Sequence, residues 1–161
     1  PTRAVTLVIA DEFTDALVRQ GVSVAAYDTR SQAFAQVVSA SLDEFRPYGM
    51  PVKVIVAQTR LVSVVLRLRF RADVTNPDAV ALFARTLVTQ TMNSLKAGET
   101  FDPTSVENLL KSVSGLDWTG DEVASPVGPI VPTSPYQLLR TSLALVTFDG
   151  QATLQRQAAN V

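Results

Sequence analysis

The alternation of residue types between Val62 and Arg71 constrains the fold more than any other feature of the sequence. Apolar side chains occupy every second position on one side of this stretch: Val62, Val64, Leu66, Leu68 and Phe70. The intervening positions are mostly polar: Ser63, Val65, Arg67, Arg69 and Arg71. A period of two is typical of a strand with one buried and one solvated face. We therefore predict a long strand in a sheet that is covered on one side.

Other segments have the β-branched, apolar character of strands. Val52, Val54 and Val56 share one face of a strand just before the long one. The link Gln58–Arg60 is short enough for a β-hairpin, although it lacks the glycine that tight turns favour. Further strands are predicted over residues 4–10, 22–26, 116–118 and 138–148.

Two helices are predicted after the long strand, because a capping residue is followed by proline at two places. Asn76-Pro77 begins a helix whose buried stripe is expected to be Val80, Phe83, Ala84, Leu87, Val88, Met92 and Leu95. Asp102-Pro103 begins another, with one face formed by Val106, Leu109, Leu110 and Val113.

Earlier in the chain, a helix is predicted over residues 29–45. Its apolar face is expected to contain Phe34, Val37, Val38, Leu42 and Phe45. Either Thr29, in a capping box with Gln32, or Asp28 is the expected cap. A short helix over residues 11–20 and its acidic first turn, Asp11-Glu12-Phe13-Thr14-Asp15, precede it.

These elements together predict an α+β fold, a mostly antiparallel sheet with helices packed on one face. Residues 1–50 are expected to form an N-terminal strand-helix segment, residues 51–150 the main α+β domain, and residues 151–161 a tail.

Composition excludes several kinds of chemistry. The chain has 161 residues with no histidine and no cysteine, so thiolate or imidazole metal sites, thiol nucleophiles and Ser-His-Asp triads are not available. We expect no catalytic, cofactor or metal site and no enzymatic activity. The net charge of −1 gives no reason to expect a nucleic-acid partner. No apolar run of about 18 residues occurs, so no membrane insertion is expected.

Three groups of residues are candidates for an interface. Arg67, Arg69 and Arg71 form a stripe that either tracks a phosphate backbone or, as we expect, lies on a solvated face or the rim of a protein interface. Trp118 is the only tryptophan, and is interpreted as a core or interface anchor. Prolines recur every three residues at Pro126, Pro129, Pro132 and Pro135, followed by Tyr136. Such a segment is either a polyproline-II ligand or, the reading we favour, an ordered strap against its own domain or a neighbour.

Four segments have a pattern that is found in a known family. The first, residues 37–49, is a helix that ends in a proline-glycine turn, Phe45-Arg46-Pro47-Tyr48-Gly49. The second comprises the two apolar runs at 52–58 and 62–66. The third joins Met92-Asn93-Ser94-Leu95-Lys96-Ala97-Gly98 to Phe101-Asp102-Pro103, and the fourth is Leu109-Leu110-Lys111-Ser112-Val113-Ser114-Gly115-Leu116.

In this order the segments resemble the C-terminal half of the J-like baseplate wedge proteins of contractile phage tails and related injection systems. The resemblance implies a structural subunit that acts through protein–protein contacts in assembly and in the triggering of contraction. Its partners would be other baseplate or tail proteins and copies of itself, in the virion tail and, during assembly, in the host cytoplasm. The alternative is an accessory domain that binds a small molecule or a peptide, with the sheet face and the proline loop forming the site. An exposed, concave apolar pocket beside Trp118 would favour this alternative.

Overall fold

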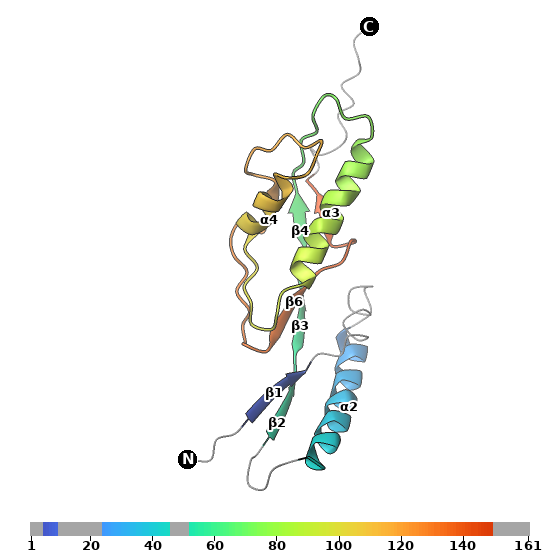
Figure 1. Ribbon diagram of the computed structural model, residues 1–161, viewed down its shortest axis with the longest axis vertical. Coiled ribbons are helices and arrows are strands. Elements are labelled where there is room, and N and C mark those ends of the chain that lie inside the picture. The colour runs from blue at the N-terminus through green and yellow to red at the C-terminus, as the bar shows by residue number, and fades with distance from the viewer. Residues whose placement is uncertain (1–4, 10–23, 46–51, 150–161) are drawn as a thin grey trace.

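An almost continuous extended path runs along the length of the molecule. In the computed structural model, which describes residues 5–9, 24–45 and 52–149, this path comprises β2 (Val52–Val56), β3 (Gln58–Leu61) and β4 (Val64–Leu66). Figure 1 shows the three strands following one another along the long axis. Each has different strand partners, so the path connects three small sheets.

The N-terminal end of the path belongs to a strand–helix–strand unit. Strand β1 (Val5–Ile9) pairs in parallel with β2, with Val5 opposite Val52 and Ile9 opposite Val56. Helix α2 (Val24–Asp43) connects the two strands and packs on β2. A parallel pair needs such a crossover, because a tight turn can only reverse the chain.

Two predictions about this region are wrong. Residues 24–26 are helical, not part of a strand, because Val24-Ala25-Ala26 begins α2 and alanine is the strongest helix former. Thr29 and Asp28 therefore lie inside the helix and cannot cap it. The predicted strand residues 22–23, the helix over 11–20 and the Pro47–Gly49 turn lie outside the described residues.

The predicted hairpin at Gln58–Arg60 is also wrong. These residues belong to β3, which pairs in parallel with β6 (Gln137–Arg140) from the far end of the sequence. Because the link contains no residue that favours a tight turn, the chain continues in an extended conformation.

The remaining strands form a three-stranded sheet in the order β5-β4-β7. Strand β5 (Val123–Ser125) is antiparallel to β4, and β7 (Val146–Phe148) is parallel to it. The expectation of a mostly antiparallel sheet is therefore wrong: the α+β class is correct, but the small sheets are parallel or mixed.

Two of the predicted strands are shorter than expected. The strand over 62–70 is reduced to β4, after which Phe70 makes an isolated antiparallel bridge with Leu116. The strand over 138–148 is divided into β6 and β7 at Thr141. At this residue the side-chain amide of Asn93 forms hydrogen bonds with both backbone polar groups of Thr141. Its Nδ2 donates to Thr141 O at 3.0 Å and its Oδ1 accepts from Thr141 N at 2.9 Å.

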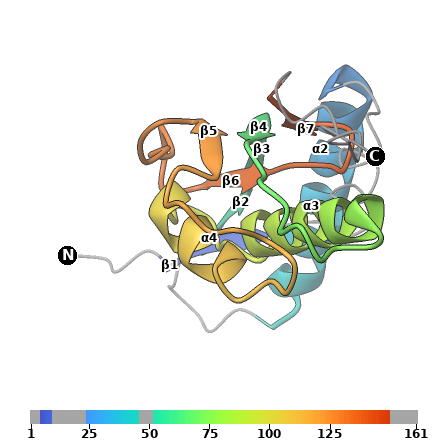
Figure 2. The same cartoon turned by 90° about the horizontal axis from the view of Figure 1, so that it is seen from above.

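The two helix starts marked by proline are confirmed. Helix α3 (Pro77–Asn93) is capped by Asn76, whose side chain accepts from Ala79 N at 3.1 Å. Helix α4 (Pro103–Leu110) is capped by Asp102, which accepts from Thr104 N at 3.0 Å. Helix α3 packs on β6 and β7 and α4 packs on β5. Figure 2 shows both helices on the same side of these strands.

The hydrophobic core lies between these helices and the strands. The alternation of the Val62–Leu68 stretch is confirmed, because its four apolar side chains are buried against α3 and α4. In α3 the buried line is Ala84, Val88 and Met92, spaced four residues apart. Phe83 was predicted to be buried but is 58% exposed, and Leu109 of α4 is also exposed. Both lie at the rims of their helical stripes. No helix of the described residues is long and apolar enough to cross a membrane.

Candidate interaction surface

The proline-containing segment is held on the domain by backbone pairing in its middle. Ile130 N donates to Phe101 O at 2.8 Å, and Phe101 N donates to Ile130 O at 3.0 Å. Phe101 is buried in the core, so this pairing fixes the segment to the centre of the domain. At its end, Thr133 N donates to the side-chain oxygen of Gln137 at 3.0 Å.

A close backbone approach fixes the other end of the segment. Gly98 N donates to Gln137 O at 2.9 Å, and Gly98 has a φ of +77°. A Cβ atom at Gly98 would lie 2.8 Å from Pro135 O, nearer than a side chain can approach a backbone oxygen. Only glycine fits this position, and the segment is therefore ordered from Ile130 to Gln137.

Two valines of the proline-containing segment project into solvent. Val127 is 94% exposed and Val131 is 64% exposed, while Ile130 between them is half-buried against the core. Pro129 and Pro135 are exposed, and Pro126, Pro132 and Tyr136 are half-buried. We call Val127, Pro129 and Val131 the valine knuckle. Sequence reasoning selected the prolines and missed the valines, although an aliphatic residue in a segment that cannot be a central strand is a signal for exposure.

Trp118 is attached to α4. Its Nε1 donates to Glu107 O at 3.2 Å, and the Lys111 ammonium lies 4.7 Å from the ring centroid. The predicted strand over 116–118 reduces to the single bridge at Leu116, because Trp118 lies beyond it in a loop. The ring is 39% exposed. No hydrogen bond or ring contact of the described residues joins Trp118 to the valine knuckle, and the expectation that Trp118, the proline loop and Tyr136 form one interface stays a prediction.

The arginine stripe is matched by carboxylates of this same chain. Arg67 binds Asp149 through Nε at 3.1 Å and Nη2 at 2.9 Å, and its Nη1 lies 3.3 Å from Asp121. Arg69 lies 3.7 Å from Asp121. Arg71, further along, faces Asp73 at 3.4 Å. This internal pairing does not favour the phosphate-tracking interpretation, since the arginines already have anionic neighbours.

Hydrogen bonds shift the pKa values of Asp121 and Arg67 in this network. The hydroxyl of Thr119, which donates to Asp121, together with Arg67 and Arg69 lowers the pKa of Asp121 below its ordinary value. The hydrogen bonds of Arg67 to Asp149 and Asp121 raise the pKa of Arg67. Both side chains are substantially exposed, so these pairs orient the loops and contribute little to stability.

A buried carboxylate, which sequence reasoning did not identify, fixes the loop between Trp118 and β5. Glu122 is 2% exposed and accepts hydrogen bonds from the backbone N–H groups of Thr119 and Gly120 and from the Thr119 hydroxyl. Its own backbone oxygen accepts from Arg67 N at 2.7 Å. Buried polar groups with such partners stabilise a defined loop conformation. We therefore assign Glu122 a structural role.

Metal-binding chemistry finds no support in this part of the chain. The described residues contain no group of three or more His, Cys, Asp or Glu side chains that could hold a metal ion. The acidic residues Asp11, Glu12 and Asp15 lie outside the described residues.

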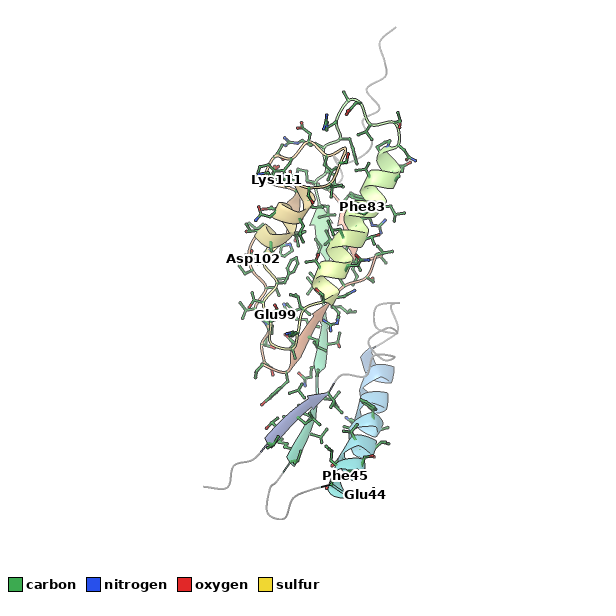
Figure 3. The ribbon with its side chains drawn as sticks, in the orientation of Figure 1. Glu44, Phe45, Phe83, Glu99, Asp102 and Lys111 are labelled. Carbon is green, nitrogen blue, oxygen red and sulfur yellow. The ribbon has the colours of Figure 1, made fainter. Side chains whose placement is uncertain are left out.

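The strand–helix–strand unit exposes apolar surface of a different kind. None of the described side chains of β1, α2 and β2 is buried. Phe45 and Val37, both predicted to face a core, are 79% and 64% exposed. Figure 3 places Phe45 beside Glu44 at the end of α2 that is remote from α3 and α4. This unit therefore has strongly apolar strands, and none of its described side chains belongs to the hydrophobic core.

No protein-family model matches this chain, and no curated protein matches it significantly.

Proposed function

We propose that this chain is a structural subunit of a phage-type tail baseplate, a wedge component that acts through protein–protein contacts in assembly and in the triggering of contraction. Its partners would be other baseplate or tail proteins and copies of itself. It would reside in the virion tail and, during assembly, in the host cytoplasm. The resemblance of four segments to the J-like wedge proteins suggests the kind of assembly.

One observation carries the proposal that the chain acts by contact. The valine knuckle displays two aliphatic side chains on either side of Ile130, whose backbone is fixed by its pairing with Phe101. A rigid apolar projection loses little conformational freedom when a partner covers it. Apolar residues that project from an ordered loop are therefore well suited to fill a pocket on a neighbouring protein.

The charged residues support the same proposal indirectly. The arginines that sequence reasoning considered for ligand binding are paired with Asp121, Asp149 and Asp73. Glu122, the buried carboxylate, is occupied in holding its own loop. Each of these side chains already has a polar partner within the chain.

The first experiment locates the chain in a particle. An epitope-tagged copy is expressed in the native system, and tail-like or injection particles are purified and imaged by negative stain with an antibody to the tag. Labelling at the baseplate end is expected. Absence of the chain from every such particle, with the purified protein free of bound partners, would overturn the proposal.

The second experiment tests the surface. Val127→Asp/Val131→Asp should reduce incorporation into the particle by tenfold or more, because two desolvated carboxylates oppose an apolar contact. Val127→Ile/Val131→Ile is the matched control, since it keeps the surface apolar, and should assemble normally. Circular dichroism should show both variants folded, because the two side chains project into solvent. Normal assembly of the Asp variant would remove the valine knuckle from the interface.

A further inference from the structure

Strand β1 is paired on one edge only. It forms a two-stranded sheet with β2, and no other described segment pairs with its second edge. A two-stranded sheet is marginally stable, and parallel sheets are normally covered on both faces. The unit β1–α2–β2 is therefore incomplete as an isolated structure.

The hydrogen bonds show which residues face the open edge. Ala57 N donates to Ile9 O at 2.9 Å, so the backbone polar groups of Ile9 point toward β2. Along a strand these groups alternate between the two edges, which directs the backbone of Val5 and Leu7 toward β2 as well. The N–H and C=O groups of Thr6 and Val8 consequently point to the open edge.

This edge has no feature that prevents pairing with another strand. Natural edge strands are usually protected by lysine, proline or a bulge. The sequence of β1 is Val-Thr-Leu-Val-Ile, with no charge and no proline, and its register with β2 is regular. Its open backbone groups are therefore available to a further strand.

The arrangement is complementary to itself. If two copies of β1 run antiparallel about a two-fold axis at Leu7, Thr6 of each copy lies opposite Val8 of the other. Both residues of each such pair have outward backbone groups, so four hydrogen bonds form. The charged residue of the two strands that lies nearest to the pairing is Lys53 of β2. In the dimer it would lie three strand spacings, about 14 Å, from Lys53 of the second copy. This distance exceeds the electrostatic screening length of about 8 Å. No charged side chain of β1 or β2 therefore opposes the pairing.

We propose that the open edge of β1 binds β1 of a second copy of this chain, in antiparallel register about Leu7, to give a four-stranded sheet in the order β2-β1-β1-β2. A two-fold axis perpendicular to the sheet leaves both α2 helices on the same face. This inference rests on the proposed function in that it names one partner of the subunit.

Disulfide cross-linking tests the pairing directly, because the natural chain has no cysteine. Leu7 is a non-hydrogen-bonded position on the two-fold axis, where the two Cα atoms would be about 4.5 Å apart, within the range that a disulfide spans. Purified full-length Leu7→Cys should form a covalent dimer on mild oxidation at least tenfold faster than Val37→Cys. Random collision predicts the opposite order, since Val37 is 64% exposed whereas Leu7 is half-buried.

A second pair of variants separates pairing from folding. Val8→Pro removes an outward N–H and no hydrogen bond to β2, and proline is tolerated on an edge strand. It should convert the dimer to a monomer in analytical ultracentrifugation, whereas Val8→Ala should remain dimeric. Equal cross-linking of Leu7→Cys and Val37→Cys, or a wild-type protein that is monomeric at every concentration, would overturn the inference.

The results also separate the two proposals. Tagged chain in the particle without Leu7→Cys dimers refutes the pairing alone. Leu7→Cys dimers without any particle refute the baseplate role alone. Cross-linking of Leu7→Cys to a different protein in the particle would show that another chain occupies the edge, and would refute the second copy as its partner.

Discussion

Asp121 is the residue on which the charges around β4 converge. It accepts a hydrogen bond from the Thr119 hydroxyl and lies 3.3 Å from Arg67 and 3.7 Å from Arg69. These neighbours lower its pKa in the folded chain. A carboxyl group with a lowered folded pKa stabilises the fold above its ordinary, unfolded pKa. That stabilisation is lost as the pH falls through the folded value.

Asp121→Asn should therefore change the pH dependence of stability. At pH 7 we expect a fall in Tm of no more than a few degrees, because the carboxylate is exposed. The difference from wild type should shrink as the pH falls from about 4 through the folded pKa, since wild-type Asp121 is then protonated too. Differential scanning calorimetry between pH 7 and pH 2 measures both effects. A difference that is constant across this range, or that is unchanged in 1 M salt, would contradict the electrostatic role.

Gly98 is the residue that lets the backbone of the proline-containing segment approach the loop between α3 and α4. Gly98→Ala places a methyl group 2.8 Å from Pro135 O at a φ of +77°, and should lower the free energy of unfolding by about 1–3 kcal/mol. Gly128→Ala, in the proline-containing segment itself, is the matched control, because nothing lies within 4 Å of its added Cβ. It should stay within about 1 kcal/mol of wild type. Urea unfolding measures both, and equal effects would refute the role of the close approach.

At the scale of elements, the helix starts marked by proline and the period-two face were predicted correctly, whereas the strand at residues 24–26, the cap of the helix that follows it and the strand partners were not. The starts of α3 and α4 follow from Asn76 and Asp102, because a capping side chain and the backbone N–H that donates to it lie within three residues. The buried face of the Val62–Leu68 stretch follows from its period of two. The strand partner of Gln58–Leu61 does not follow from the sequence, because β6 lies far away in the chain. A period of two shows which face of a strand is buried but not which strand lies beside it.

The candidate surface shows the same division. The prolines and Trp118 were found by composition, since both residue types are conspicuous in any sequence. The exposure of Val127 and Val131 depends on the pairing of Ile130 with Phe101, which no local pattern reveals. The burial of Glu122 depends in the same way on the loop that surrounds it. The sequence therefore selected the proline-containing segment as a candidate surface but did not reveal the contacts that expose its valines.

The cap of α3 provides a quantitative test at this scale. Asn76→Ala removes the acceptor of Ala79 N and should lower the free energy of unfolding by about 1 kcal/mol. Asn76→Ser keeps a capping oxygen and should retain most of that stability. Both values come from urea unfolding with unchanged slope. Equal losses for the two substitutions would show that the cap does not stabilise the helix.

At the scale of the whole molecule, burial is distributed unevenly along the extended path. The described side chains of β1, α2 and β2 are all exposed or half-buried, whereas β4, α3 and α4 contribute to a continuous core. Ala57 lies at the junction: its N–H donates to Ile9 of β1, and the next residue, Gln58, donates to Tyr136 at the start of β6. The two parts thus share one backbone path but not one core.

This distribution predicts unequal hydrogen exchange. In dilute protein, amides of β1, α2 and β2 should exchange at least tenfold faster than those of β4 and α3, because local opening of the unit exposes little additional apolar surface. Mass spectrometry on proteolytic fragments measures this. If a second copy covers β1, protection of residues 5–9 should rise with protein concentration, while that of α3 stays constant. Protection of β1 and α2 equal to that of α3 at every concentration would mean that the unit is stable without any partner.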